Sequence, residues 1–209
     1  MMTRFFTTGT TIATFVLAVA LVCPVARPAA AQTDGFKELK RTKDGIVVSR
    51  KPGRTKGFYV LRFESTSPVS PERLISKAWD TFAIAMPPVK ERRFIKRGAD
   101  ELVFYDRVAT PVVSDRDYTM KINRVSNGEV LRLDFGTTDQ FGPPPDPAYV
   151  RMGMVKGYWQ AEPDGQGGSK VRYEVYSEPG GSIPAAIVRD AMLKEALGDY
   201  RRTLKDVRK

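Results

Sequence analysis

The stretch EPGGSIPAAIVRDAM, Glu178 to Met192, sets the architecture of this chain. It follows an alternating run, SKVRYEVYSEP at 169–179, that is typical of a strand, and it leads into a helical pattern near the end of the sequence. Two glycines, a serine and two prolines are more than a simple turn requires. The connector therefore predicts a helix that leaves a sheet at a defined angle and can move relative to it.

The last helix is predicted to begin at Ser182 as its N-cap and to run for about 24 residues, or about 36 Å. Helical spacing places Arg189, Glu195, Arg202 and Lys205 opposite an apolar stripe. That stripe consists of Ile183, Ala186, Ile187, Leu193, Leu197, Tyr200 and Leu204. Asp190 falls within the stripe, where a carboxylate is costly unless it is paired or faces water. Asp190 is therefore either an ion-pair partner of a surface cation or a polar group inside a ligand cavity.

The preceding segments read as strands around one helix. Ser70, Pro71 and Glu72 predict a helix start, and apolar residues spaced by four continue the pattern to Met86. A short helix is predicted over 34–41, and Asn127-Gly128 predicts a tight hairpin. Strands are predicted at 44–52, 57–65, 91–96, 101–109, 116–125, 129–137, 149–161 and 170–177. Strands in series with segregated helices indicate an α+β fold built on an antiparallel meander.

Residues 1–31 are predicted to be a signal peptide, and 32–209 to be one domain. The apolar run from Thr11 to Val22 and the alanines before Gln32 support export to the periplasm or outside the cell. An uncleaved membrane anchor is the alternative, although Pro24 and Arg27 end the apolar run early for a spanning helix. A lipoprotein would use Cys23 as its lipid acceptor. Small residues are expected just before such a cysteine, and Leu21 and Val22 do not fit this pattern.

The chain of 209 residues contains one cysteine and no histidine. Ser-His-Asp triads, Cys-His pairs and zinc sites with histidine ligands are therefore excluded. We expect no cofactor, no metal and no catalytic residue, although carboxylates, tyrosine, lysine or serine could still act as catalysts.

The sequence carries 34 basic and 24 acidic residues, a formal net charge of +10. Loss of Arg4 and Arg27 with a signal peptide would leave about +8. This balance serves either solubility or transient contact with an anionic membrane surface, and we expect no nucleic-acid partner. A monomer is the expected state.

Three segments carry a family likeness. VVSDRDYTMKINRV at 112–125 contains an S-D-R-D-Y strand entry. Residues 156–192 combine two strands, a tryptophan at Trp159 and a Gly-Gly…Ile-Pro entry into the last helix, while DGIVVSRKPGR at 44–54 forms an early strand. Together they resemble the START domains, the lipid-transfer branch of the helix-grip superfamily, from Asp34 to Val207.

The resemblance implies a curved antiparallel sheet around a long C-terminal helix, with a tunnel for one hydrophobic molecule. It implies that Val108–Asp117 and the last helix form a lid, with Pro179, Gly180, Gly181 and Pro184 as hinge. Sterol-binding relatives pair a buried acid, here Asp106, with an arginine at a position occupied by Ile122. The residues expected to contact the ligand are Phe104, Asp106, Tyr118, Met120, Ile122, Leu133, Met152, Met154, Trp159, Tyr173, Ile183, Ile187 and Asp190.

The function expected from this resemblance is binding of one lipid or sterol-like molecule and its carriage between membranes across the periplasm. Methionine adapts to irregular apolar surfaces, which suits such a site and suits plain core packing equally. Two alternatives stay open: an aromatase/cyclase-like enzyme that uses the same tunnel, and a lipid sensor or binding subunit of an envelope complex.

Overall fold

The structure is a computed structural model, which describes residues 34–86, 88–110, 114–181 and 183–207. The chain divides into two units, and the described residues belong to the second, Asp34–Lys209. The predicted signal peptide and the predicted N-cap at Ser182 lie outside the described residues.

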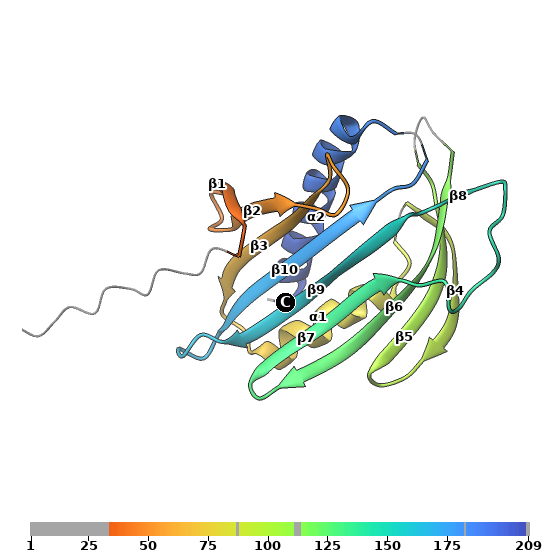
Figure 1. The fold of residues 1–209 in the computed structure, drawn as a ribbon. Coiled ribbons are helices and arrows are strands. Elements are labelled where there is room, and N and C mark those ends of the chain that lie inside the picture. Colours follow the sequence, from red (N-terminus) through yellow and green to blue (C-terminus); the bar gives the residue numbers. More distant parts are fainter. Residues whose placement is uncertain (1–33, 87, 111–113, 182, 208–209) are drawn as a thin grey trace, which may run out of the picture. The chain divides into compact units, whose positions relative to one another are not determined.

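A ten-stranded sheet dominates this unit, and it curves around both helices (Figure 1). Nine strands follow the order β1-β2-β3-β10-β9-β7-β6-β5-β4, and β8 pairs with β6 in parallel. The strands are β1 Lys37–Arg41, β2 Val47–Pro52, β3 Tyr59–Ser67, β4 Val89–Arg97, β5 Glu101–Val108, β6 Arg116–Asn127, β7 Val130–Thr137, β8 Val150–Arg151, β9 Met154–Pro163 and β10 Ser169–Glu178.

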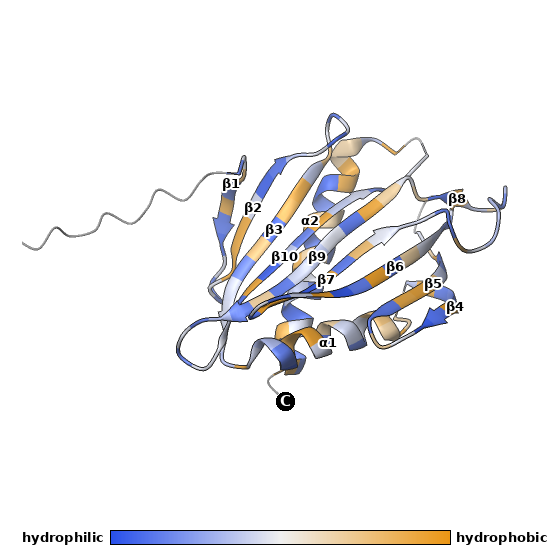
Figure 2. Ribbon diagram, turned by 60° about the horizontal axis from the view of Figure 1, so that its bottom comes forward, coloured by the Kyte–Doolittle hydropathy of each residue, from blue (hydrophilic) through white to orange (hydrophobic). Residues whose placement is uncertain are grey.

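Alternation of apolar and polar residues gives this sheet two different faces, visible as alternating colours along the strands in Figure 2. The β6–β7 hairpin confirms the predicted turn, because Gly128 has a φ of 60° and Asn127 is paired with Val130. The N-terminal hairpin β2–β3 joins the C-terminal strand β10, so the two ends of the domain meet inside one sheet.

Two helices cover the inner face. Helix α1, Pro71–Ala83, begins as predicted: the Ser70 hydroxyl accepts a hydrogen bond from the Arg73 amide, and Pro71 opens the first turn. It ends three residues before Met86. Helix α2, Ala185–Val207, has 23 residues, close to the predicted length. Both helices pack into a single apolar core.

The core beneath the second part of α2 is a stack of aromatic rings. The ring centroids of Trp159 and Tyr173 lie 4.4 Å apart, and those of Trp159 and Tyr200 lie 5.4 Å apart. The Tyr200 hydroxyl also reaches the Ser65 hydroxyl at 2.9 Å and donates to the Val171 carbonyl at 3.2 Å. This part of α2 is therefore fixed on β3 and β10 by packing and by hydrogen bonds.

The predicted helix over 34–41 is wrong, because Lys37–Arg41 forms edge strand β1 on β2. Residues before it are held on the outer face: Asp34 pairs with Arg62, whose guanidinium lies 3.7 Å from the centre of the Phe36 ring. These tertiary contacts outweigh a weak local helix pattern in a segment of exposed side chains.

Candidate functional site

The sheet brings most of the predicted ligand-contacting residues onto one inner wall. Across neighbouring strands Phe104 pairs with Met120, Asp106 with Tyr118, and Trp159 with both Leu133 and Tyr173. Period-two alternation places their side chains on the side that faces the helices. Met120, Phe104 and Tyr173 are nearly buried, whereas Tyr118 is half-buried.

The wall has two parts with different properties. Leu133, Trp159 and Tyr173 belong to the aromatic core closed by Tyr200, so the prediction that they line an open tunnel is not met there. Phe104, Tyr118 and Met120 lie on β5 and β6, strands that do not take part in the Tyr200 stack. This second part of the wall is the stronger candidate for ligand contact.

One polar cluster interrupts the apolar wall. Asp106 has no exposed surface, and Arg92 on β4 donates to its two carboxylate oxygens at 2.7 and 2.6 Å. The Tyr118 hydroxyl donates to the same carboxylate at 3.0 Å. Burial, and then the negative charge of Asp106, raise the pKa of Tyr118 well above its ordinary value, so this hydroxyl stays protonated. A ligand polar group could meet this hydroxyl and carboxylate without any catalytic step.

Arg92 is the functional residue that sequence reasoning missed. The sequence placed the arginine expected beside Asp106 at the position of Ile122, but the partner comes from the opposite neighbour of β5. An irregularity between Phe94 and Lys96 shifts the β4–β5 register and puts Arg92 directly across from Asp106. A search for arginines on the adjacent predicted strand could have found it.

Arg92 also ties the sheet to the end of α1. Its guanidinium donates to the backbone carbonyls of Phe82 and Ile84 at 2.6 and 3.0 Å, and it lies 3.8 Å from the centre of the Phe104 ring. Only 9% of the Arg92 side chain is exposed. The carboxylate and these two carbonyls therefore compensate the buried charge.

Four predicted residues are not part of this wall. Met154 lies an odd number of residues from Trp159 on β9, so its side chain points to the outer face of the sheet. Met152 lies in the link between β8 and β9, where its backbone amide donates to the Asp117 carbonyl. Ile187 is 67% exposed and Asp190 is exposed, because the first part of α2 turns these positions to solvent. The hypothesis that Asp190 lies inside a cavity is therefore wrong, and no described ion pair includes it. Ile183 lies half-buried before the first turn of α2.

Residues of α2 other than Ile187 and Asp190 pack against the inner wall. Val188 is buried, and Met192 and Leu193 pack against the core cluster. Glu195 is exposed, as expected of the outward side, but desolvation still raises its pKa, and its charge helps to raise the pKa of Tyr118 and Tyr173. The side chain of Asp199 remains 45% exposed although burial also raises its pKa, so both carboxyl groups stand at the margin of the inner face.

The predicted hinge is a close-packed connector. Gly180 and Gly181 have φ angles of 72° and 68°, which favour glycine, and a β-carbon at Gly180 would lie 2.6 Å from the Arg151 carbonyl oxygen. Arg116 donates to the Pro179 carbonyl at 3.5 Å. Pro184 is exposed just before α2. The first residues of the connector are therefore held against β8.

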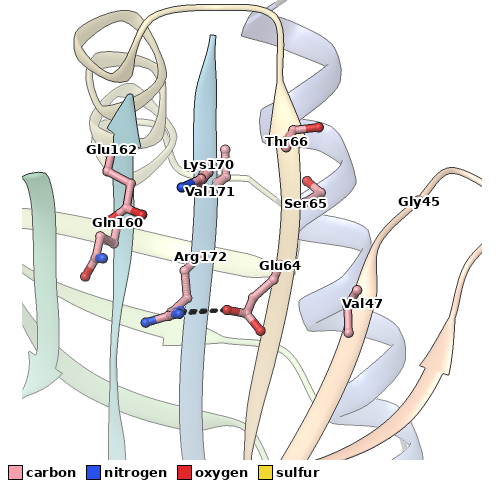
Figure 3. Close-up of a pocket in the computed structure, with 10 residues that line it drawn as sticks. All are labelled: Gly45, Val47, Glu64, Ser65, Thr66, Gln160, Glu162, Lys170, Val171 and Arg172. Atoms are coloured by element: carbon pink, nitrogen blue, oxygen red, sulfur yellow. Dashed lines mark hydrogen bonds and ion pairs between the residues drawn. The ribbon is translucent and has the colours of Figure 1, made fainter. Parts of the chain in front are cut away.

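Among the pockets that the described residues form, two bear on ligand binding, and no residue of α2 lines either of them. The first, of about 330 Å³, lies on the outer face of β3, β9 and β10 (Figure 3), where Arg172 pairs with Glu64 at 2.8 Å. The second, of about 220 Å³, lies beside the 138–153 segment and is lined by Tyr118, Met152 and Met154 among others, so it brings three of the predicted ligand-contacting residues together. Polar and apolar surface contribute about equally to both linings, whereas a pocket for an apolar ligand is predominantly apolar.

No set of three acidic, cysteine or histidine side chains within the described ranges could hold a metal ion. No helix of the described part of the chain is long and apolar enough to span a membrane.

No family model matches the sequence. A curated relative, an uncharacterised protein of Pseudomonas aeruginosa, is 28% identical over 121 residues. The match covers 56% of this chain and 57% of that relative, so the chain spans little more than half of the relative's length.

Solved structures give a broader likeness. A STAR-related lipid transfer protein from Xanthomonas axonopodis superposes with a TM-score of 0.70 at 22% identity, over 84% of this chain and all of that one. Human STARD10 gives 0.68 at 16% identity over 83% and 73% of the two chains. Human StAR-related lipid transfer protein 5 gives 0.64 at 16% identity over 85% and 88%.

The curved antiparallel sheet and its long terminal helix define a helix-grip domain. Within that class the chain has the fold of the StAR-related lipid-transfer, or START, domains, including a bacterial one. The expectation drawn from the sequence motifs is thereby confirmed at the level of the fold.

Proposed function

We propose that this chain binds one hydrophobic molecule, a lipid or sterol-like compound, against the inner wall beneath the first part of α2, and carries it between membranes. The observation that carries the proposal is the combination on β5 and β6: apolar Phe104 and Met120 lie beside the Arg92–Asp106–Tyr118 cluster. An apolar surface with one fixed polar group at its side suits an amphiphile with a small polar end. Two of the three similar solved structures are named lipid transfer proteins, which supports the same interpretation.

Simple energetics allow binding without covalent chemistry. A ligand that loses about 500 Å² of apolar surface gains about 12 kcal/mol at about 25 cal/mol per Å². Lost freedom and ordering remove about 4 kcal/mol or more. The remaining free energy is at most about 8 kcal/mol, which corresponds to a dissociation constant of about 1 μM at the tightest. Because neither described pocket lies under α2, the ligand would take its place as Val188, Met192 and Leu193 move outward.

The test compares an inner and an outer methionine. Met120→Trp fills the proposed site from β6, whereas Met154→Trp adds the same bulk on the outer face. The purified chain is extracted with organic solvent, the extract is analysed by mass spectrometry, and thermal melting confirms that each variant is folded. We expect a lipid with the wild type and Met154→Trp and none with folded Met120→Trp. Loss of lipid from both variants, or from neither, would count against the proposed site.

We also propose that the chain is exported to the periplasm, acts as a monomer and contacts an anionic membrane transiently. The cations Arg54 and Lys56 at the β2–β3 hairpin lie beside the start of α2, since a β-carbon at Gly57 would be 3.0 Å from that of Ala185. Arg189 and Lys194 follow on α2, and none of these four cations joins an ion pair among the described residues. Each cation near an anionic leaflet contributes about 1 kcal/mol.

Binding to liposomes tests the membrane contact. Arg54→Glu/Lys56→Glu should abolish sedimentation with anionic liposomes at low salt. The matched control, Arg73→Glu/Lys77→Glu, makes the same change in net charge on α1, at the other end of the sheet (Figure 1). Equal loss in both variants would show a general charge effect and no defined surface.

Carriage, sensing and catalysis give different results with the same material. Transfer of a fluorescent phospholipid between donor and acceptor liposomes supports carriage, while lipid binding without transfer supports a sensor. The fold is shared with the Zhui aromatase/cyclase from Streptomyces sp. R1128, at a TM-score of 0.50 and 11% identity over 72% of this chain and 94% of that one. A cyclase would bind a polyketide chain in preference to lipid.

A further inference from the structure

Helix α2 is attached to the domain unevenly. Among the described residues, every side-chain hydrogen bond or ion pair between α2 and other elements involves Tyr200, Arg201 or Arg202. Arg201 donates twice to Asp44 at 2.8 Å. We define Ala185–Leu197 as the lid segment and Asp199–Val207 as the anchor segment.

The lid segment is held mainly by apolar contacts, to which the Arg189 guanidinium, 6.0 Å from the centre of the Tyr59 ring, adds one cation-π contact. Val188, Ala196 and Leu197 are buried, and Met192 and Leu193 pack partly against the core. Its remaining residues are exposed or half-exposed, and Ile187 retains 67% of its surface. Few buried contacts and no polar tie are the properties of a segment with low local stability.

Gly198 lies between these two segments. A β-carbon at Gly198 would have no atom within 4 Å, so no neighbour requires a glycine there. In contrast, Gly157 on β9 is required, because a β-carbon would lie 2.0 Å from the Glu174 carbonyl oxygen. Glycine is the weakest helix former after proline, and it gives the backbone of this one turn greater freedom.

The same turn carries a second destabilising feature. Glu195 and Asp199 are four residues apart on one side of α2, with Gly198 between them, and like charges at this spacing weaken a helix. Asp199 is paired with Arg202 at 3.4 Å, and no described ion pair includes Glu195. The weak turn therefore falls where the apolar lid meets the fixed anchor.

A segment tethered at both ends can swing only if both ends give way. One pivot would lie in the connector before α2, which the family resemblance implies to be a hinge. We infer that Gly198 is the second pivot, about which the lid segment lifts from the inner wall while the anchor segment stays on β3 and β10. Val188, Met192 and Leu193 leave the core together in this motion and uncover the wall beneath. The inference rests on the proposed function only in that the uncovered wall is the proposed ligand site.

Hydrogen exchange followed by mass spectrometry tests the pivot in the ligand-free chain. Amides of residues 185–197 should exchange faster than those of the anchor segment. Gly198→Ala should slow exchange in the lid segment by about fourfold to fivefold, the equivalent of about 0.8–1.0 kcal/mol of helix propensity. The control Ser76→Ala strengthens α1 at an exposed position and should leave the lid unchanged. Release of a bound NBD-labelled phosphatidylcholine should slow in parallel in Gly198→Ala.

The inference is wrong if the two segments exchange as one unit, or if Gly198→Ala protects both equally. If the lid exchanges as expected while the labelled phospholipid does not bind, the pivot stands and the proposed function fails with that probe. If the phospholipid binds while exchange is uniform, the proposed function stands and the pivot does not.

Discussion

The buried pair of Arg92 and Asp106 should be one of the strongest energetic couplings in this domain. Arg92→Met leaves the Asp106 carboxylate, which has no exposed surface, with only the Tyr118 hydroxyl. Removing one member of a buried ion pair costs about 3–5 kcal/mol. The Phe82 carbonyl also loses its donor, which adds about 1 kcal/mol. Asp106→Leu alone should cost about 3 kcal/mol, because Arg92 keeps its two carbonyl partners.

The double variant Arg92→Met/Asp106→Leu removes both charges and should lose only about 2 kcal/mol, mainly from unpaired carbonyl and hydroxyl groups. The sum of the two single effects would then exceed the double effect by about 5–7 kcal/mol. Urea unfolding followed by circular dichroism measures all four proteins, and the slopes with urea should agree. A double effect equal to the sum of the single effects would refute the reasoning that the two charges compensate each other.

Three further predictions use the same stability measurement. Arg201→Ala removes a bidentate pair with Asp44, but both side chains are about half exposed (46% and 47%), so the loss should stay below about 1 kcal/mol; a loss near that of Arg92→Met would contradict this. Gly157→Ala would place a β-carbon 2.6 Å from the Phe135 ring and should cost about 3 kcal/mol or more, whereas wild-type stability would show that the strand can shift. Burial raises the pKa of Glu195, so its contribution to stability is complete below its unfolded pKa and is lost as the pH rises through its folded pKa. Glu195→Gln should therefore be more stable than the wild type at neutral pH, with a gap that closes on acidification, and a gap independent of pH would argue against a raised pKa at this position.

The sequence predicted the fold well because its strongest signals are local. The alternation along 169–178, the Asn127-Gly128 turn and the Ser70-Pro71 helix start each depend on near neighbours, and each corresponds to the expected element. The segment 37–41 was misread because its strand exists only through pairing with β2 and through the anchoring of residues before it on Arg62.

The site was predicted only in part because it depends on register and on how far a helix lies from a sheet. Phe104 and Met120 follow from strand alternation, but the pairing of Arg92 with Asp106 depends on an irregularity inside β4. The exposure of Ile187 and Asp190 depends on how the first part of α2 lies over the sheet, which helical periodicity alone does not encode.

Native mass spectrometry of the purified chain with a panel of lipids and sterols tests the central claim most directly. We expect complexes of one ligand per chain for the wild type and Met154→Trp, and none for folded Met120→Trp. Spectra that show only unliganded protein with every compound, or equal binding by all three proteins, would contradict a ligand site on the inner wall beneath α2.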